Sequence, residues 1–210
     1  MPAILIFETS TDTASLALAV DGRIVIERTF TSDRRHNALL FGPLAEIVEE
    51  YGCRHFDMIL VGSGPGSYSG TRVGIAAAQG AGLVSGCRTI AIPSVLATAT
   101  ALSGKPCLAV GDARRGSYWI ANINGGELVN GPILTDGVGF QAALDLNPSR
   151  FSMEPIRSFN IPLEQPSAHG IWQVWENASS ELQDAWTTKP PQPIYLAPPH
   201  ITPSKKQVFG

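Results

Sequence analysis

The residues best placed for chemistry lie in and around a glycine-rich segment, GSGPGSYSGTRVG, which begins at Gly62. A loop of this composition before a helix can hold a phosphate with its backbone N–H groups. Two carboxylates end apolar runs elsewhere in the chain, Glu8 in the first and Asp112 in a later one. Together with Gly66 and Ser67 they form a candidate phosphate or anion site, and phosphoryl transfer is the chemistry such a site would perform.

The familiar nucleotide motifs do not fit this segment. A P-loop places a lysine directly after its second glycine, where this chain has Thr71. A dinucleotide fingerprint needs a third glycine, and both possible registers put a serine there. Residues 59–110 also contain no Asp or Glu, although a magnesium–nucleotide site commonly has a carboxylate nearby. The segment therefore favours packing over phosphate binding.

Small residues recur at every fourth position through this segment, which places them on one face of a helix expected to end near Ser85. They are Gly66, Gly70, Gly74, Ala78 and Gly82. A glycine inside a helix costs up to about 1 kcal/mol relative to alanine, so several of them indicate close approach of another backbone. That backbone is either a strand beneath the helix or a helix of a partner, and the sequence leaves both open.

The histidines, serines and arginines of the chain do not indicate a metal site or a catalytic residue. No two of the four histidines are three or four residues apart, so no helix carries a zinc or iron pair. Ser67 has no G-x-S-x-G context and no evident base, which argues against a nucleophile. Arg114 and Arg115, beside Asp112, are expected to form a charged hairpin tip. Neither a metal site nor a catalytic residue is predicted.

The elements that hold these residues repeat one plan. Glu8 precedes Gly22 by fourteen positions, and Asp112 precedes Gly126 by fourteen, with three strand-like runs around each pair. This predicts an α/β chain with two lobes, residues 1–103 and a smaller lobe of residues 104–210. The first lobe is expected to contain strands at 3–8, 14–20 and 23–30, a helix at 33–51, a strand at 57–62, the glycine helix to 85 and a strand at 88–92.

The last third of the chain carries weaker signals. Short helices are predicted around residues 135–146 and 167–186, with the tryptophans of the second one packed inward. The tail from residue 189 is rich in proline, so we expect it to lie along the surface or to fray.

Composition excludes several classes of protein. The chain has 210 residues, of which 44% are hydrophobic, and this is enough for a sizeable core. A formal net charge of −3 gives no overall attraction for a nucleic acid backbone. Three dispersed cysteines and the lack of a basic, apolar leader or a membrane-length apolar run predict a cytoplasmic protein with no membrane contact.

Several segments carry a family likeness. FETSTDTASLAL, VGSGPGSYSGTRVGIAAAQG, VGDARRGSYW and the late PIYLAPP resemble, in order, the signature segments of the TsaB (YeaZ) family. Members of that family are dimerisation partners of the bacterial threonylcarbamoyl transferase TsaD. The resemblance implies a two-lobe fold like that of actin, hexokinase and the Hsp70 ATPase. It also implies a non-catalytic scaffold that supports N6-threonylcarbamoylation of the adenosine beside the anticodon (t6A) in tRNA.

The resemblance also implies partners and an interface. The expected partners are a TsaD-like catalytic subunit, further proteins such as the TsaE ATPase, a second copy of the chain when it is alone, and tRNA only through the complex. No cofactor of its own is implied, although ATP or ADP could bind at a subunit junction. The expected interface comprises His36, Leu40, Leu44, Ile47, Gly70, Arg72, Gly74, Ala78 and Gly82. Replacing Gly74 by leucine is expected to abolish pairing through this interface.

The catalytic relative carries two metal-binding histidines where this chain has Ser94 and Thr98, neither of which holds a transition metal well. The family also commonly has aspartate at the position of Glu8. The alternative function is an actin-like phosphotransferase or ATPase that uses Glu8 and Asp112 around ATP. A glycoprotease would need a metal or nucleophile constellation, which the sequence does not provide.

Overall fold

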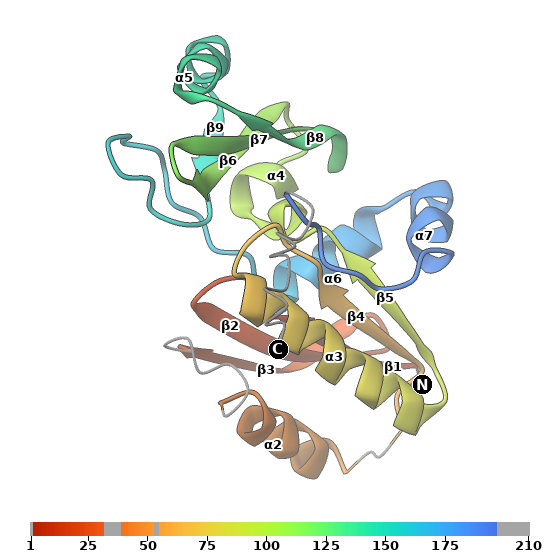
Figure 1. Ribbon diagram of the computed structural model, residues 1–210. Helices are drawn as coiled ribbons and strands as arrows, with labels where there is room; N and C mark the ends of the chain where they lie inside the picture. Colours follow the sequence, from red (N-terminus) through yellow and green to blue (C-terminus); the bar gives the residue numbers. More distant parts are fainter. Residues whose placement is uncertain (1, 32–38, 53–54, 197–210) are drawn as a thin grey trace, which may run out of the picture.

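The protein consists of two β-sheets with helices packed around each, as seen in a computed structural model (Figure 1). The structure describes residues 2–31, 39–52 and 55–196. The first sheet contains β1 (Ala3–Glu8), β2 (Thr13–Val20), β3 (Arg23–Thr31), β4 (Met58–Gly62) and β5 (Arg88–Ile92). The second sheet contains β6 (Cys107–Arg114), β7 (Ser117–Asn124), β8 (Glu127–Thr135) and β9 (Arg150–Ser152).

The first sheet has the strand order β3-β2-β1-β4-β5. The meander β1–β3 is antiparallel, whereas β4 and β5 run parallel to β1. The turn between β2 and β3 uses Asp21 and Gly22, both with positive φ (48° and 79°), as a two-residue hairpin of this twist requires. The strands expected in the first lobe are therefore confirmed.

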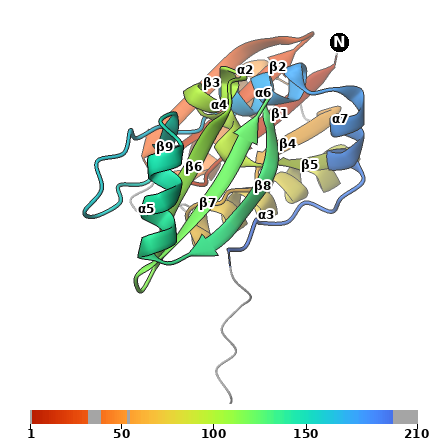
Figure 2. The same ribbon diagram turned by 90° about the horizontal axis from the view of Figure 1, so that it is seen from above.

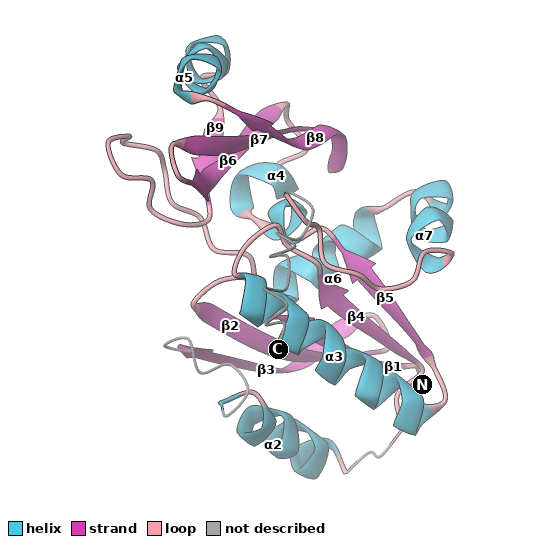
Figure 3. Cartoon of the chain, in the orientation of Figure 1, coloured by secondary structure: helices cyan, strands magenta, loops and turns pink. Residues whose placement is uncertain are grey.

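Helices cover both faces of the first sheet, which explains why its strands read as continuous apolar runs (Figure 3). One face packs against α2 (Phe41–Tyr51) and α3 (Tyr68–Ser85). The other face packs against α6 (Ala168–Asn177), with α7 (Ser180–Thr187) beside β5. The glycine helix is confirmed over its expected length. The helix expected from residue 33 begins at Phe41 within the described residues, and Pro43 sits in its first turn, where proline causes no kink.

The second sheet repeats the plan with fewer elements. Its order is β8-β7-β6-β9, with an antiparallel meander and β9 parallel to β6, just as β4 is parallel to β1. Figure 2 shows this sheet from above, with α5 (Gly137–Leu146) on its outer face. Its inner face joins the larger core cluster together with η1 (Ser94–Ala97) and α4 (Ala99–Leu102). The duplicated plan, and with it the two-lobe α/β actin-like fold class, is confirmed.

The chain returns to the first sheet after β9. The single helix expected near residues 167–186 is two helices, because Ala178 is extended and Ser179 caps α7 by accepting the N–H of Leu182 at 3.2 Å. Trp172 and Trp186 are buried, as expected. α6 and α7 follow the second sheet in the sequence but pack on the first sheet. The division of the chain at residue 103 therefore stays a prediction. Within the described residues, no helix combines the length and the apolar character needed to cross a bilayer.

Candidate functional site

The glycine loop packs directly against the backbone of the segment that follows β1. Ser67 caps α3 by accepting the N–H of Gly70 at 3.2 Å, and its own N–H donates to the carbonyl of Ser10 at 2.6 Å. A Cβ on Gly66 would lie 2.3 Å from that same carbonyl, so only glycine lets the two segments approach. The backbone around the start of α3 therefore contacts the end of β1.

Glu8 is buried completely at the end of β1. Its Oε1 accepts the N–H of Ser10 at 2.7 Å, and its Oε2 lies where a Cβ on Gly62 would be only 1.9 Å away. Burial raises the pKa of this carboxyl, partly offset by hydrogen bonds from Ser10 and Ser94. A carboxyl enclosed in this way is part of the core and cannot reach a nucleotide in solvent.

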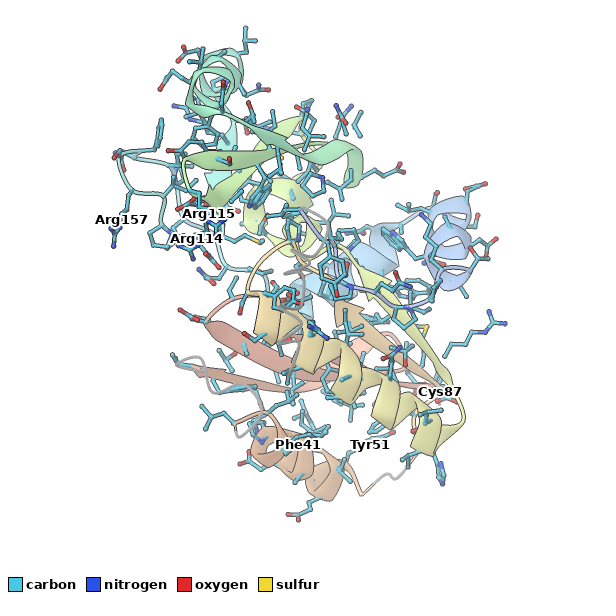
Figure 4. The ribbon with its side chains drawn as sticks, viewed as in Figure 1. Phe41, Tyr51, Cys87, Arg114, Arg115 and Arg157 are labelled. Carbon is cyan, nitrogen blue, oxygen red and sulfur yellow. The ribbon has the colours of Figure 1, made fainter. Side chains whose placement is uncertain are left out.

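Asp112 lies at the junction of the lobes. Its carboxylate accepts the N–H of Arg114 at 2.7 Å and lies 3.9 Å from the guanidinium of the same residue. Arg114 and Arg115 have positive φ (71° and 55°) at the hairpin tip, as expected, and both are labelled in Figure 4. The Asp112 carboxylate is thus engaged in shaping its own turn.

The junction itself is nearly filled. Gly66 and Asp112 line one pocket of about 40 Å³, together with Trp119 and Leu196. The Trp119 indole lies over Gly111, where a Cβ would be 2.2 Å from Nε1. Ligand pockets typically measure about 300–1,000 Å³, so this one is too small for a nucleotide. Of the four residues predicted for the anion site, the structure brings Gly66 and Asp112 together, whereas Glu8 and Ser67 do not line the pocket.

Ser94 and Thr98, the positions at which the resemblance implies histidines in the catalytic relative, make local hydrogen bonds in this chain. Both are fully buried. The Ser94 hydroxyl accepts the N–H of Gly64 at 2.9 Å, and the Thr98 hydroxyl donates to the carbonyl of Val95 at 3.0 Å. In the described part of the chain, no group of three or more His, Cys, Asp or Glu side chains could hold a metal ion.

The small-residue face of α3 packs inside the molecule. A Cβ on Gly74 would lie 2.1 Å from the Thr9 hydroxyl, and one on Gly82 would lie 2.5 Å from the hydroxyl of Thr89. Gly70 and Ala78 are buried on the same face. Of the two explanations left open by the sequence, the strand beneath the helix is the correct one. The expectation that Gly70, Gly74, Ala78 and Gly82 contact a partner is wrong, since the chain's own strands already occupy that face.

Other residues of the expected interface divide between core and surface. Leu40 and Ile47 are fully buried in the core, which rules out direct contact with a partner. Leu44 lines a surface groove, and Arg72 is exposed. The Arg72 guanidinium lies over the Tyr68 ring, 5.1 Å from its centroid, and donates to the Tyr68 hydroxyl at 2.7 Å. His36 lies outside the described residues.

An apolar groove of about 910 Å³ runs between α2 and α3 on the outer surface. Figure 4 labels Phe41 and Tyr51 between these helices, and Phe41 is 57% exposed. At the far end of α3, Val84 is 73% exposed, and the neighbouring Leu83 is 85% exposed. We call this groove the docking surface. It is lined by Leu5, Phe41, Leu44, Val48, Phe56, Val73, Ala76, Ala77, Gly80, Ala81, Val84 and Ser85.

Sequence reasoning missed most of this lining. The signal was present: Val73, Ala77, Gly80 and Val84 follow each other at spacings of three and four, which is a second small or apolar stripe on α3. The stripe through Gly74 repeats strictly every fourth residue, and only the packing shows which of the two stripes faces the sheet.

Comparison with solved structures supports the fold. An uncharacterized protein with similarity to peptidase YEAZ, from Pseudomonas aeruginosa, superposes with a TM-score of 0.67 at 21% identity, covering 94% of this chain and all of that one. YeaZ from Pseudomonas aeruginosa superposes with a TM-score of 0.62 at 20% identity, covering 93% of this chain and all of that one. The resemblance to the TsaB (YeaZ) family is confirmed. No curated protein matches the chain.

A protein-family model also matches the sequence of this chain. The model of TsaD, described as tRNA N6-adenosine threonylcarbamoyltransferase, matches residues 25–139, which is more than half of the chain. The match runs from β3 through the glycine helix and into the second sheet, and so includes both helices that form the docking surface. The chain therefore belongs to the TsaD family.

Proposed function

We propose that this protein is a non-catalytic docking subunit of a tRNA threonylcarbamoyl transferase. It would pair with a TsaD-like catalytic subunit through the docking surface and so support N6-threonylcarbamoylation of the adenosine beside the anticodon. Family membership and the YeaZ-like fold supply the biochemical context. The observation that carries the proposal is the apolar groove between α2 and α3.

The composition of the groove suits a protein partner. Its walls are apolar side chains and small residues, with only one polar residue, Ser85, in the lining. Contiguous exposed apolar surface of this kind marks interaction sites in proteins that are otherwise polar outside. The alanines and glycine on α3 would let a partner helix approach closely, and Phe41 and Val84 would supply apolar burial at its two ends.

Two features support a non-catalytic role. The carboxyl that an actin-like phosphotransferase would use, Glu8, is enclosed in the core, and the junction pocket is about 40 Å³. The positions of the catalytic histidines hold hydroxyls that are already used in local hydrogen bonds. Both features would be expected in a family member that keeps the fold but has replaced the reactive groups.

The other partners follow from this role. A chain with a net charge of −3 would contact tRNA only through the complex, and a TsaE-like ATPase would join the assembled pair rather than this chain alone. In the absence of the catalytic subunit, the same apolar surface would pair with a second copy of the chain. The protein would act in the cytoplasm, where tRNA is modified.

The test is the mass in solution, by light scattering after size exclusion, of this protein mixed with the TsaD-like subunit of the same organism. Ala76→Glu places a carboxylate within the apolar groove, where a partner would bury it unpaired, and we expect the affinity to fall at least about a hundredfold. Gln79→Glu is the matched control, because Gln79 is exposed on the same helix, outside the groove. It adds the same charge and should bind normally.

Two results would contradict the proposal. One is the absence of any complex with the wild-type protein at micromolar concentrations. The other is equal binding by Ala76→Glu and Gln79→Glu, because a partner that tolerates a carboxylate in the groove does not cover it.

A further inference from the structure

The segment Pro190–Leu196, which we call the strap, passes the end of β4 in the first sheet. It leaves α7 through Lys189, whose N–H donates to the carbonyl of Trp186 at 3.3 Å. Further along, the N–H of Ile194 donates to the carbonyl of Ser63 at 2.8 Å. Ser63 directly follows β4, so the strap passes the carboxyl end of a central parallel strand.

The end of the strap reaches the second lobe. Leu196 packs against the large core cluster and lines the junction pocket beside Gly66 of the first lobe and Asp112 and Trp119 of the second. One side chain thus touches both lobes where they meet. Residues 190–196 are exposed or half-buried, so this part of the tail lies along the surface, as expected.

The strap is also held from outside. The ring of Tyr195 lies 6.1 Å from that of Tyr68, at 47° to it, and Tyr68 is the first residue of α3. The strap therefore has three anchors: a backbone hydrogen bond at Ile194, a ring contact at Tyr195 and apolar packing at Leu196.

The strap lies where proteins with an open α/β sheet commonly bind a ligand. Open α/β sheets bind ligands in the crevice outside the carboxyl ends of their strands, where the strand order reverses. In this protein that point lies between β1 and β4, and the strap passes the end of β4 beside it. The prolines at 190, 191 and 193 fix φ in three of the strap's residues, which lowers the entropy lost when it is ordered.

We propose that the strap is a built-in plug that holds the two lobes closed over this crevice. The crevice is then occupied by the chain itself, and the lobe arrangement needs no bound ligand to stay closed. This inference is independent of the docking partner, because it concerns the isolated chain.

Two truncations test it by hydrogen–deuterium exchange followed by mass spectrometry. The chain ending at Leu196 keeps the strap, and the chain ending at Lys189 lacks it. We expect the chain ending at Leu196 to exchange like the full chain. In the chain ending at Lys189, the peptides that cover 63–67 and 111–119 should exchange at least about tenfold faster, while those of β2 and β3 stay protected.

Equal protection of the junction peptides in both truncated chains would overturn the proposal. If β2 and β3 also lose protection, the shorter chain has not folded, and the full-length variant Leu196→Asp then decides the question. Its matched control is Gln192→Asp, because Gln192 lies on the same strap away from the junction pocket. Faster exchange at the junction in Leu196→Asp alone supports the plug, and identical exchange in the two variants overturns it.

Discussion

Two glycines of α3 should respond in opposite directions to the same substitution. In an exposed helix position, Gly→Ala stabilises by up to about 1 kcal/mol, because alanine has less backbone entropy to lose. Gly80 meets this condition, since a Cβ there would have no atom within 4 Å. At Gly74 the new Cβ would lie 2.1 Å from the hydroxyl oxygen of Thr9, which is buried.

The magnitude at Gly74 follows from its contacts. Overpacking a well-filled site costs about 1–3 kcal/mol, and this outweighs the gain in helix propensity. The Thr9 hydroxyl cannot move away freely, because it donates to the carbonyl of Gly70 at 2.8 Å and losing that buried bond costs roughly another 1 kcal/mol. We therefore expect Gly74→Ala to lower the free energy of unfolding by about 1–3 kcal/mol.

The assay is urea unfolding of the two single variants, read by circular dichroism, followed by a double-mutant cycle. Thr9→Ala removes the atom that the new Cβ would meet, so it should rescue Gly74→Ala, with a coupling of about 1–2 kcal/mol. If Gly74→Ala proves as stable as Gly80→Ala, α3 does not press on the end of β1, and close packing on the sheet is refuted as the cause of the small-residue face.

Three further predictions concern titration and turnover. Because burial raises the pKa of Glu8 above its unfolded value, the folded state retains a proton that the unfolded chain releases, so stability should fall as pH rises above about 4.5 until the folded pKa is passed. Glu8→Gln should flatten this dependence in denaturant titrations, and an unchanged slope would contradict it. Burial raises the pKa of Cys107 to about 11 and also raises that of the half-buried Cys87, so at pH 8 iodoacetamide should label Cys87 before Cys107 because Cys87 is more accessible. Mass spectrometry measures the two rates, and equal rates would count against this difference in burial. The isolated protein should hydrolyse no ATP, and a saturable activity lost in Asp112→Asn would revive the phosphotransferase alternative.

Much of the fold could be predicted because its signals are local. Apolar runs bounded by turns indicated the strands, and the spacing from Glu8 to Gly22, repeated from Asp112 to Gly126, indicated the duplication. The break between α6 and α7 was missed although the sequence carries a local signal for it, because Asn177, Ser179 and Ser180 around Ala178 are weak helix formers and favoured helix caps.

The site was harder to predict for a physical reason. A repeat of small residues shows that a helix packs closely, but not whether it packs on its own sheet or on another molecule. That distinction depends on Thr9, which is distant from Gly74 in the sequence, and on Thr89 in the strand after the helix, which the fold brings against Gly82. Burial of Glu8 likewise depends on Gly62, on a different strand.

The contact between Glu8 and Gly62 limits how this chain can change by single substitutions. A Cβ at position 62 would lie 1.9 Å from Oε2 of Glu8 and 2.6 Å from the hydroxyl of Ser94, so a side chain there must displace both buried groups. A shorter carboxylate at position 8 would retract that oxygen by one methylene. The two positions are therefore coupled: with glutamate at position 8, a side chain at position 62 must displace both that carboxylate and the Ser94 hydroxyl, and a shorter acid would remove only the first of these contacts.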